Sequence, residues 1–317
     1  MPRALAAAPR QRPPSSTPTA ASPLPAGAVY SSSGGRLAYL VLGGAAVAAA
    51  ALYLAGAAPG WLVAALLALR GALVPLGCFF APAGVFGPVL LRGAPTRPLV
   101  ALTFDDGPDP VATPRVLAAL ARHGATATFF VIGDRAARHP EVLAQIHAAG
   151  HQIENHSLRH AWGTAFAPPA RLAAELRQAS ALITAVTGQA PRWLRAPIGV
   201  LSPRVFAAAE RAGLGLCGWS GKARDGWRGT SVEDATRRLL RALRPGAILL
   251  LHDAPELLSA SAASDPGAGP AARRQQPVAA EVLDRLLPVL AERGLRPVRL
   301  DELLPPPPHQ AARSHRC

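Results

Sequence analysis

The first part of the chain contains two long apolar runs. The first run, residues 37–58, carries no charged side chain, and as a helix it would be about 33 Å long, which matches the hydrocarbon core of a bilayer. The alternative is the core of a signal peptide with a cleavage-like site at residues 55–57, but the region before it is long for a signal peptide. We therefore predict a membrane anchor.

The second apolar run, residues 61–91, is interrupted by Arg70 and by three prolines. As a second span it would form a hairpin with arginines on both flanks and none in its turn, and the positive-inside rule would then place the C-terminal region in the cytoplasm. Against this, Arg70 near the bilayer centre would cost about 3 kcal/mol, and the prolines suit an interfacial segment better. With one span the C-terminal region would face outward, and both topologies stay open.

Strand-like and helix-like patterns alternate from residue 98 to about residue 300. The helix at residue 113 opens with a Thr cap followed by Pro at the first helical position. This β/α repeat predicts a parallel sheet or barrel. The predicted strands cover residues 98–104, 126–132, 151–154, 193–195, 214–219, 247–251 and 297–300, and the predicted helices cover residues 113–124, 140–149, 171–186, 203–212, 232–243 and 278–292.

Composition divides the chain into four parts. Residues 1–35 are rich in Pro, Ser and Ala and predict a flexible tail, and residues 36–97 form the membrane-anchoring region. Residues 98–303 form the α/β domain, and residues 304–317 form a second disordered tail. Within the domain, residues 259–276 are rich in Ala, Gly and Ser and predict a flexible loop.

The charge distribution indicates a membrane protein. The net charge is +14 over 317 residues, and seven arginines but no acidic residue precede Asp105. The basic residues lack the aromatic interleaving of a nucleic-acid platform, so we assign the charge to membrane orientation and expect no nucleic-acid partner. The three cysteines have no CxxC spacing, which argues against a disulfide framework or a thiolate zinc site.

The motif TFDDGP at residues 103–108 places two carboxylates, Asp105 and Asp106, at the end of a buried strand. Adjacent carboxylates repel each other unless a cation or a shared proton offsets their charge. The pair therefore indicates a metal site or coupled acid/base chemistry. A solvated turn is the alternative, because Asp, Gly and Pro are common in turns.

Two imidazoles four residues apart, His156 and His160, follow the predicted strand at residues 151–154. This spacing lets both rings face one ion, although an isolated His pair is more often surface chemistry or packing. Together with Asp106 they supply two nitrogens and one oxygen. This is the three-ligand set that leaves a fourth position open for water in a catalytic zinc site.

Several polar residues share one position, at or just after the C-terminal end of a predicted strand. In β/α barrels this rim carries the active site. Taken singly, Arg195 could be a surface ion-pair residue, Asp225 a turn former, and His252 the polar end of a buried strand. Their shared position favours a functional role for the whole set, which consists of Asp105, Asp106, His156, Arg195, Asp225 and His252.

These motifs, in this order, resemble the polysaccharide deacetylases, the carbohydrate esterase family 4 or NodB homology group, over about residues 98–300. The resemblance implies an α/β fold, a distorted (β/α) barrel of about seven parallel strands, here preceded by the N-terminal transmembrane segment or segments. The chain departs from the family pattern at Ala196, where proline is usual, and at Ile198, where an aromatic is usual. The matching segments are residues 103–108, 156–160, 195–199, 219–227 (with Asp225) and 248–252.

The resemblance also implies a division of roles. Asp105 would be the general base, and a divalent ion, Zn²⁺ or alternatively Co²⁺, would be held by three ligands. His252 would protonate the leaving amine, with Arg195 orienting Asp105 and Asp225 supporting the charged form of His252. The implied metal ligands are Asp106, His156 and His160.

The implied substrate contacts are a backbone N–H near Ile198, which would bind the oxyanion, and the side chains of Trp219 and Leu250. These two side chains would wall a small acetyl pocket, and plain core packing is the alternative for both.

We therefore expect a membrane-anchored, metal-dependent hydrolase of non-peptide C–N bonds, located in a bacterial inner membrane. It would remove N-acetyl groups from amino sugars of a polysaccharide, an oligosaccharide or a lipid-linked glycan. Two alternatives remain: an O-acetyl carbohydrate esterase with the same site, and a non-catalytic membrane protein that binds glycan.

Overall fold

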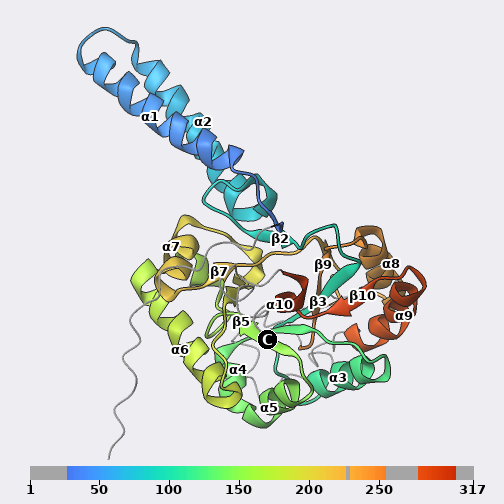
Figure 1. Ribbon diagram of the computed structural model, residues 1–317. Coiled ribbons are helices and arrows are strands. Elements are labelled where there is room, and N and C mark those ends of the chain that lie inside the picture. Colours follow the sequence, from blue (N-terminus) through green and yellow to red (C-terminus); the bar gives the residue numbers. More distant parts are fainter. Residues whose placement is uncertain (1–26, 226–228, 255–277, 305–317) are drawn as a thin grey trace, which may run out of the picture.

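The computed structural model describes residues 27–225, 229–254 and 278–304. Two helices, α1 (Gly34–Leu54) and α2 (Gly60–Phe79), form an antiparallel hairpin that projects away from an α/β domain (Figure 1). The predicted loop over residues 259–276 and most of both predicted tails lie outside the described residues.

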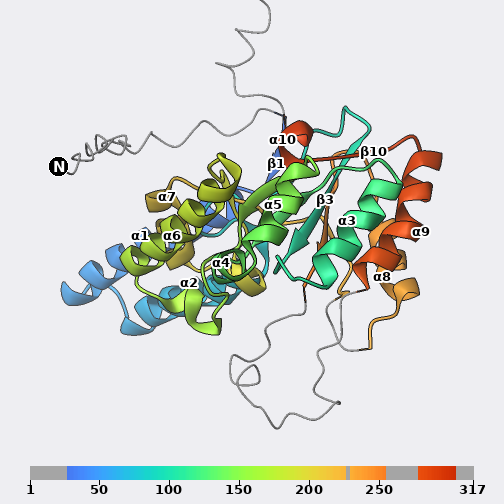
Figure 2. The same cartoon turned by 90° about the horizontal axis from the view of Figure 1, so that it is seen from below.

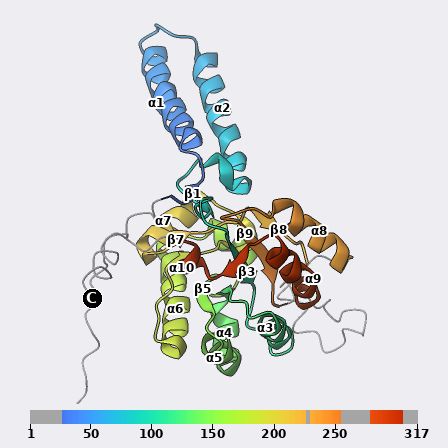
Figure 3. The same ribbon diagram turned by 45° about the vertical axis from the view of Figure 1, so that its right-hand side comes forward.

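Both hairpin helices are long and apolar enough to cross a membrane, each with a mean hydropathy of 2.0. The first part of the second apolar run, up to Phe79, therefore forms a continuous helix that includes Pro75, whereas the rest of the run leaves the helix. Figure 3 shows the two helices side by side along their length. By length and composition they are candidate membrane spans.

Arg70 packs between the two helices. Its guanidinium lies 4.1 Å from the centroid of the Tyr39 ring on α1. Gly43 makes room for it, because a Cβ at this position would lie only 3.1 Å from the Arg70 Nε. A cation over an aromatic face is stabilised by the ring quadrupole, so this contact offsets part of the cost expected for an arginine within an apolar hairpin.

The α/β domain follows a short strand, β2 (Leu90–Arg92), that pairs with β1 (Val29–Tyr30). Three short 3-10 helices also occur in the described residues: η1 (Ala81–Ala83), η2 (Trp162–Phe166) and η3 (Pro197–Gly199). The strands of the domain are β3 (Leu99–Asp105), β4 (Thr128–Val131), β5 (Gln152–Asn155), β6 (Trp193–Leu194), β7 (Gly215–Leu216), β8 (Gly221–Lys222), β9 (Ile248–His252) and β10 (Arg296–Val298). The helices are α3 (Ala112–Arg122), α4 (Gly133–Arg138), α5 (Pro140–Ala148), α6 (Pro169–Thr187), α7 (Pro203–Ala212), α8 (Val232–Ala242), α9 (Ala279–Glu292) and α10 (Leu300–Leu303).

In the described residues the main sheet has the strand order β7-β6-β5-β4-β3-β9-β8, and β10 also pairs with β3. All of these pairings are parallel. The two end strands, β7 and β8, are joined by only a short link, residues 217–220, so the sheet bends round on itself. The prediction of a distorted (β/α) barrel of about seven parallel strands is confirmed.

The structure corrects two predicted strands. The strand expected at residues 214–219 is shortened to β7, which pairs with β6, and a separate short strand beyond it, β8, pairs with β9 on the other side. The strand expected at residues 297–300 ends at Val298, and the short helix α10 begins at Leu300.

The central strand β3 is buried along its full length. Its alternate residues Val100, Leu102 and Phe104 pack in the layer between sheet and helices, whereas Leu99 and Ala101 belong to the inner cluster. Since side chains alternate across a strand, Asp105 falls on the inner face. Figure 2 shows α3, α8 and α9 grouped on one side of β3, and α6 and α7 on the other.

The foot of the hairpin is bonded to the domain. The Leu201 N–H donates to the Cys78 carbonyl at 2.9 Å, which links the loop after η3 to the end of α2. The Phe86 ring lies between two other rings, 5.5 Å from Tyr39 of α1 and 6.4 Å from Phe206 of α7 by centroid. These contacts join the hairpin, the segment before β2 and the barrel helices.

We predict that Gly221→Ala lowers the free energy of unfolding by about 1–3 kcal/mol, the usual cost of overpacking a core. A Cβ at Gly221 would lie 2.3 Å from the Cβ of Ala242 on α8. Thermal and denaturant unfolding of the full chain in detergent measure the change. Gly163→Ala is the control, because a Cβ there meets nothing within 4 Å. Equal stability of the two variants would contradict the close packing of β8 on α8.

Candidate active site

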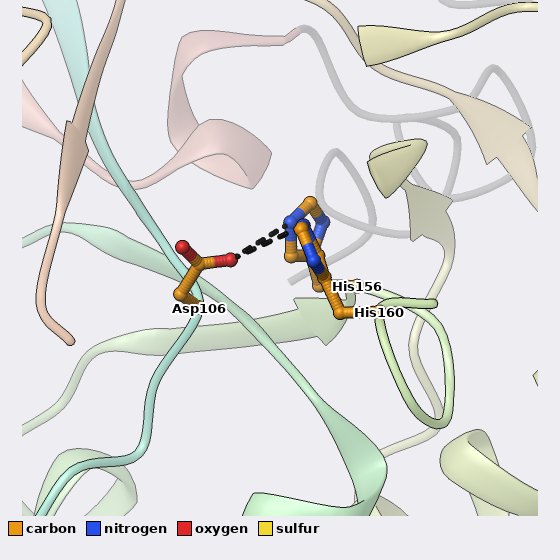
Figure 4. A group of neighbouring side chains, drawn as sticks. All are labelled: Asp106, His156 and His160. Atoms are coloured by element: carbon orange, nitrogen blue, oxygen red, sulfur yellow. Dashed lines mark ion pairs between the residues drawn. The ribbon is translucent and has the colours of Figure 1, made fainter. Parts of the chain in front are cut away.

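Three buried side chains converge at the C-terminal ends of β3 and β5 (Figure 4). Asp106 directly follows β3, and His156 directly follows β5. Asp106 Oδ1 lies 3.4 Å from Nε2 of His156 and 3.4 Å from Nε2 of His160. The ligand atoms of all three residues lie within 4.8 Å of one another.

The His156 ring is held in one tautomer. Its Nδ1 lies 2.8 Å from the carbonyl oxygen of Arg195, and because a carbonyl only accepts, Nδ1 carries the proton and donates. In the neutral form of the ring, the lone pair of Nε2 then faces Asp106. A hydrogen bond of this kind is the usual way in which proteins orient a metal-binding imidazole.

The loop that carries His160 is held by two short polar contacts. The Ser157 N–H donates to Oδ1 of Asn155 at 2.7 Å, and the His160 N–H donates to Oγ of Ser157 at 3.1 Å. Burial lowers the pKa of His160, and the neighbouring His156 lowers it further, to about 4. The ring is therefore neutral at pH 7, which is the form that binds a metal.

The donor set fits a divalent cation. Asp106 Oδ1 is buried and has no hydrogen-bond partner, although it faces two imidazole nitrogens. Burial by itself raises the pKa of Asp106, but His156, His160 and His252 around it hold that pKa well below its usual range. An ionised carboxylate oxygen without a donor is costly in a buried site, and a bound cation would satisfy it.

Asp105 forms a buried ion pair with Arg195. Arg195 NH1 lies 2.7 Å from Oδ1 of Asp105 and also donates to Oγ1 of Thr103 at 2.8 Å. Its NH2 donates to the carbonyl of Gly218 at 3.0 Å, and its Cζ lies 4.0 Å from the centroid of the Phe130 ring. The Arg195 side chain is only 1% exposed, so these contacts fix both the guanidinium and the carboxylate.

His252, the last residue of β9, pairs with the buried Asp225. Asp225 accepts two hydrogen bonds from it, one from the backbone N–H and one from Nδ1–H, both at 2.9 Å. Burial lowers the pKa of His252, but the Asp225 carboxylate outweighs burial and raises it to about 10. The imidazole is therefore cationic at pH 7 and can release a proton from Nε2.

A cavity of about 130 Å³ joins most of the predicted site residues. Arg195 and Asp225 do not line it and instead support Asp105 and His252 from behind. The predicted residues that line the cavity are Asp105, Asp106, His156, His160, Ile198, Trp219, Leu250 and His252.

Residues with strained backbone conformations cluster at the candidate active site. Among the described residues, the non-glycine residues with a positive φ are Asp106, Ser157, His160, Ile198 and Arg224, and all belong to the site or directly adjoin it. Ile198, at φ 59°, is the least expected of these, because a β-branched side chain disfavours this region. Such strain collects at functional sites, where the surrounding structure holds it.

Sequence reasoning missed three polar residues of the site. Lys222 and Arg224 line the cavity, and Asp253 fixes the turn after Asp106 by accepting from the Gly107 N–H at 3.1 Å. Two signals were available in the sequence: Lys222 is the only lysine of the chain, and Asp253 directly follows His252.

Comparison with known proteins defines the family. Residues 92–216 match the profile of the family described as "Polysaccharide deacetylase". The chain is 40% identical over 196 residues to the chitooligosaccharide deacetylase of Bradyrhizobium sp. (strain ANU 289), covering 62% of this chain and 85% of that protein. It is 34% identical over 208 residues to a peptidoglycan-N-acetylglucosamine deacetylase of Bacillus cereus, covering 65% and 88% respectively.

A solved structure extends the likeness to the fold. A family 4 acetyl xylan esterase from Clostridium thermocellum, in complex with a cobalt ion, matches with a TM-score of 0.55 and 32% identity over 65% of this chain and 89% of that chain. The chain belongs to the polysaccharide deacetylase family, as the motifs indicated. It is a hydrolase that deacetylates a polysaccharide or oligosaccharide.

We predict that the purified full chain binds a divalent cation and that His156→Ala lowers its affinity by more than about 100-fold. Loss of an outer-shell partner costs 10- to 100-fold, and His156 would be a direct ligand. Metal content after dialysis, with zinc or cobalt added, measures the change. His147→Ala is the control, since it removes a histidine of α5 that is absent from the cluster. Equal metal content in both variants would contradict the assignment.

Proposed function

We propose that this protein is a metal-dependent deacetylase that hydrolyses the N-acetyl group of an N-acetylglucosamine-type amino sugar in a glycan, an oligosaccharide or a lipid-linked saccharide. The observation that carries the proposal is the presence of a paired base and a paired acid, Asp105 and His252, in the cavity that also holds the Asp-His-His cluster. Its relatives named for chitooligosaccharide and peptidoglycan deacetylation support the substrate class.

The cation would be held by Asp106, His156 and His160. When bound, a divalent cation of this type polarises a carbonyl and lowers the pKa of a water molecule to near neutrality. Zinc is our first choice because the donors are two imidazoles and one carboxylate, and cobalt is the second.

Asp105 is the proposed general base. Its Oδ1 is engaged by Arg195, which leaves Oδ2 on the side of His156, 3.9 Å from Nε2. The ion pair fixes the orientation of the carboxylate, so that its free oxygen can take a proton from the attacking water. Arg195 therefore acts as a positioning residue.

His252 is the proposed general acid. Its Nδ1–H is held by Asp225, so the proton that it can donate is the one on Nε2. Transfer of this proton to the nitrogen of the breaking amide bond lets the amine leave. A backbone N–H near Ile198 is the proposed oxyanion donor, and the side chains of Trp219 and Leu250 wall the acetyl group.

We further propose that both hairpin helices span the membrane. The turn between α1 and α2 carries no charge, whereas Arg36 lies at the start of α1 and Arg92 and Arg97 follow α2. The positive-inside rule then places both ends of the hairpin, and with them the deacetylase domain, in the cytoplasm.

An O-acetyl esterase is the second candidate, because the chain is also similar to an acetyl xylan esterase. Ile198, which takes the place of the usual aromatic, bears on sugar binding more than on the hydrolytic chemistry. The two candidates differ only in whether oxygen or nitrogen carries the acetyl group.

The proposal predicts acetate release by the metal-loaded full chain from N-acetylglucosamine oligomers, abolished by a chelator. We expect Asp105→Asn to keep the metal and lose at least about 100-fold in kcat, the usual contribution of a general base. Acetate release from O-acetylated xylan oligomers, measured in parallel, separates the esterase candidate. A near-normal rate for Asp105→Asn would exclude its role as base.

The variant Asp225→Asn tests the proposed role of His252 as the general acid. Without the carboxylate the pKa of His252 falls, so the acid form is lost at a lower pH and the alkaline limb of the kcat profile moves toward neutrality. We expect the loss of rate relative to the parent protein to grow with pH. Asp134→Asn, a change at a half-exposed carboxylate of α4, is the control. An unmoved alkaline limb would show that His252 does not set it.

A further inference from the structure

A second and larger cavity, of about 410 Å³, adjoins the catalytic one. The two cavities share the lining residues Ala196, Gly199, Trp219 and Lys222, so they adjoin each other at these groups. The second cavity lies between the link that joins β7 to β8 and the foot of the hairpin, which contributes Phe79 to Pro82. Its volume falls within the range of about 300–1,000 Å³ that ligand pockets occupy.

The wall of this cavity suits an apolar chain. The hairpin foot supplies Phe79 and Phe80, and the domain supplies Val89 and Leu201. Phe79 is 72% exposed and Phe80 54% exposed, although exposed aromatics of this size are costly in water. They lie where α2 ends, at the level at which aromatic side chains flank a membrane span.

Positive charge lies at the border between the two cavities. Lys222 lines both, with its ammonium 5.7 Å from the centroid of the Trp219 ring, and Arg224 lines the catalytic cavity. Among the described residues that line the second cavity, the formal charges are those of Arg195 and Lys222, and none is acidic. An anionic group placed between an apolar chain and a sugar would therefore be stabilised here.

The hairpin keeps this cavity next to the membrane. The Leu201 N–H bond to the Cys78 carbonyl and the ring contacts of Phe86 tie the hairpin foot to the domain, and Figures 1 and 3 show the foot beside β2 and α7. In the topology proposed above, both hairpin ends lie in the cytoplasm, and a glycan polymer outside the membrane then cannot reach the site. A sugar carried on a lipid of the inner leaflet can.

We propose that the substrate is an N-acetylated amino sugar joined through phosphate to a lipid chain. The chain occupies the second cavity, the phosphate lies at Lys222, and the acetamide enters the catalytic cavity. Water supplies the oxygen that bonds to the acetyl carbon, the amide C–N bond breaks, and acetate and the free amine form, while the phosphate link stays intact. This inference rests on the proposed deacetylase function.

The test compares three substrates with the metal-loaded full chain in phosphatidylcholine nanodiscs. These are N-acetylglucosamine linked through phosphate to farnesol, N-acetylglucosamine 1-phosphate, and chitotetraose. We expect kcat/KM for the lipid-linked sugar to exceed that for chitotetraose by at least about 100-fold, since burial of a prenyl chain contributes that much affinity readily. Equal values would overturn the proposal and leave the deacetylase function intact.

Phe80→Glu places a negative charge and a smaller side chain on the cavity wall, and it changes an exposed position, so folding is preserved. We expect it to lower the ratio of the two kcat/KM values at least about tenfold. Phe166→Glu is the matched control, because Phe166 is also an exposed phenylalanine, at 69%, and it lines neither cavity. An unchanged ratio in Phe80→Glu would also overturn the proposal.

Absence of turnover with all three substrates would refute the deacetylase function. In that case a binding measurement still tests whether the second cavity holds a lipid phosphate. Quenching of Trp219 fluorescence reports ligand binding at the cavity. The fluorescence of Trp219 is obtained by subtracting the spectrum of the Trp219→Phe variant from that of the parent protein. Farnesyl phosphate should bind at least about tenfold more tightly than farnesol or inorganic phosphate, and Phe80→Glu should remove this preference. Equal binding of farnesol would refute the assignment of the phosphate to Lys222.

Discussion

The buried guanidinium of Arg195 is the constraint on which the rest of the site depends. A cation that is 1% exposed must be paired, or the domain loses several kcal/mol; both terminal nitrogens of Arg195 are hydrogen-bonded, whereas its buried Nε has no partner. Its side chain binds Asp105 and Thr103 of β3 and the carbonyl of Gly218 in the link between β7 and β8, while its own carbonyl orients His156. Arg195 therefore couples the closure of the sheet to the proposed base, Asp105, and to a proposed metal ligand, His156.

The energetically unfavourable features of the domain are concentrated around the same site. Asp106 carries a buried oxygen without a partner, and the left-handed backbones of Asp106, His160 and Ile198 add strain. The surroundings hold these residues because β3 is buried throughout and its neighbours on both sides pair with it in register. A rigid barrel thus tolerates a strained rim, which is the condition for a preorganised site.

The hairpin is also bonded to the loop that borders the catalytic cavity. The loop after η3 carries Ile198 and Gly199 at the catalytic cavity, and two residues later Leu201 bonds to the end of α2. The foot of the hairpin and the candidate active site are thus joined by one short segment. This connection is the physical basis on which a substrate held partly in the bilayer could be presented to the site.

The sequence by itself determined the β/α alternation, the apolar runs and the strand-end acids and imidazoles, because each depends on residues close together in the chain. It also placed Asp105, Asp106, His156 and His252 at one rim, since parallel strands bring their C-terminal ends to the same edge. Only the tertiary structure decided that β7 and β8 pair with different strands, that Arg70 packs on Tyr39, and that Lys222 and Phe80 border neighbouring cavities. These features depend on contacts between segments far apart in sequence, and no local pattern encodes them.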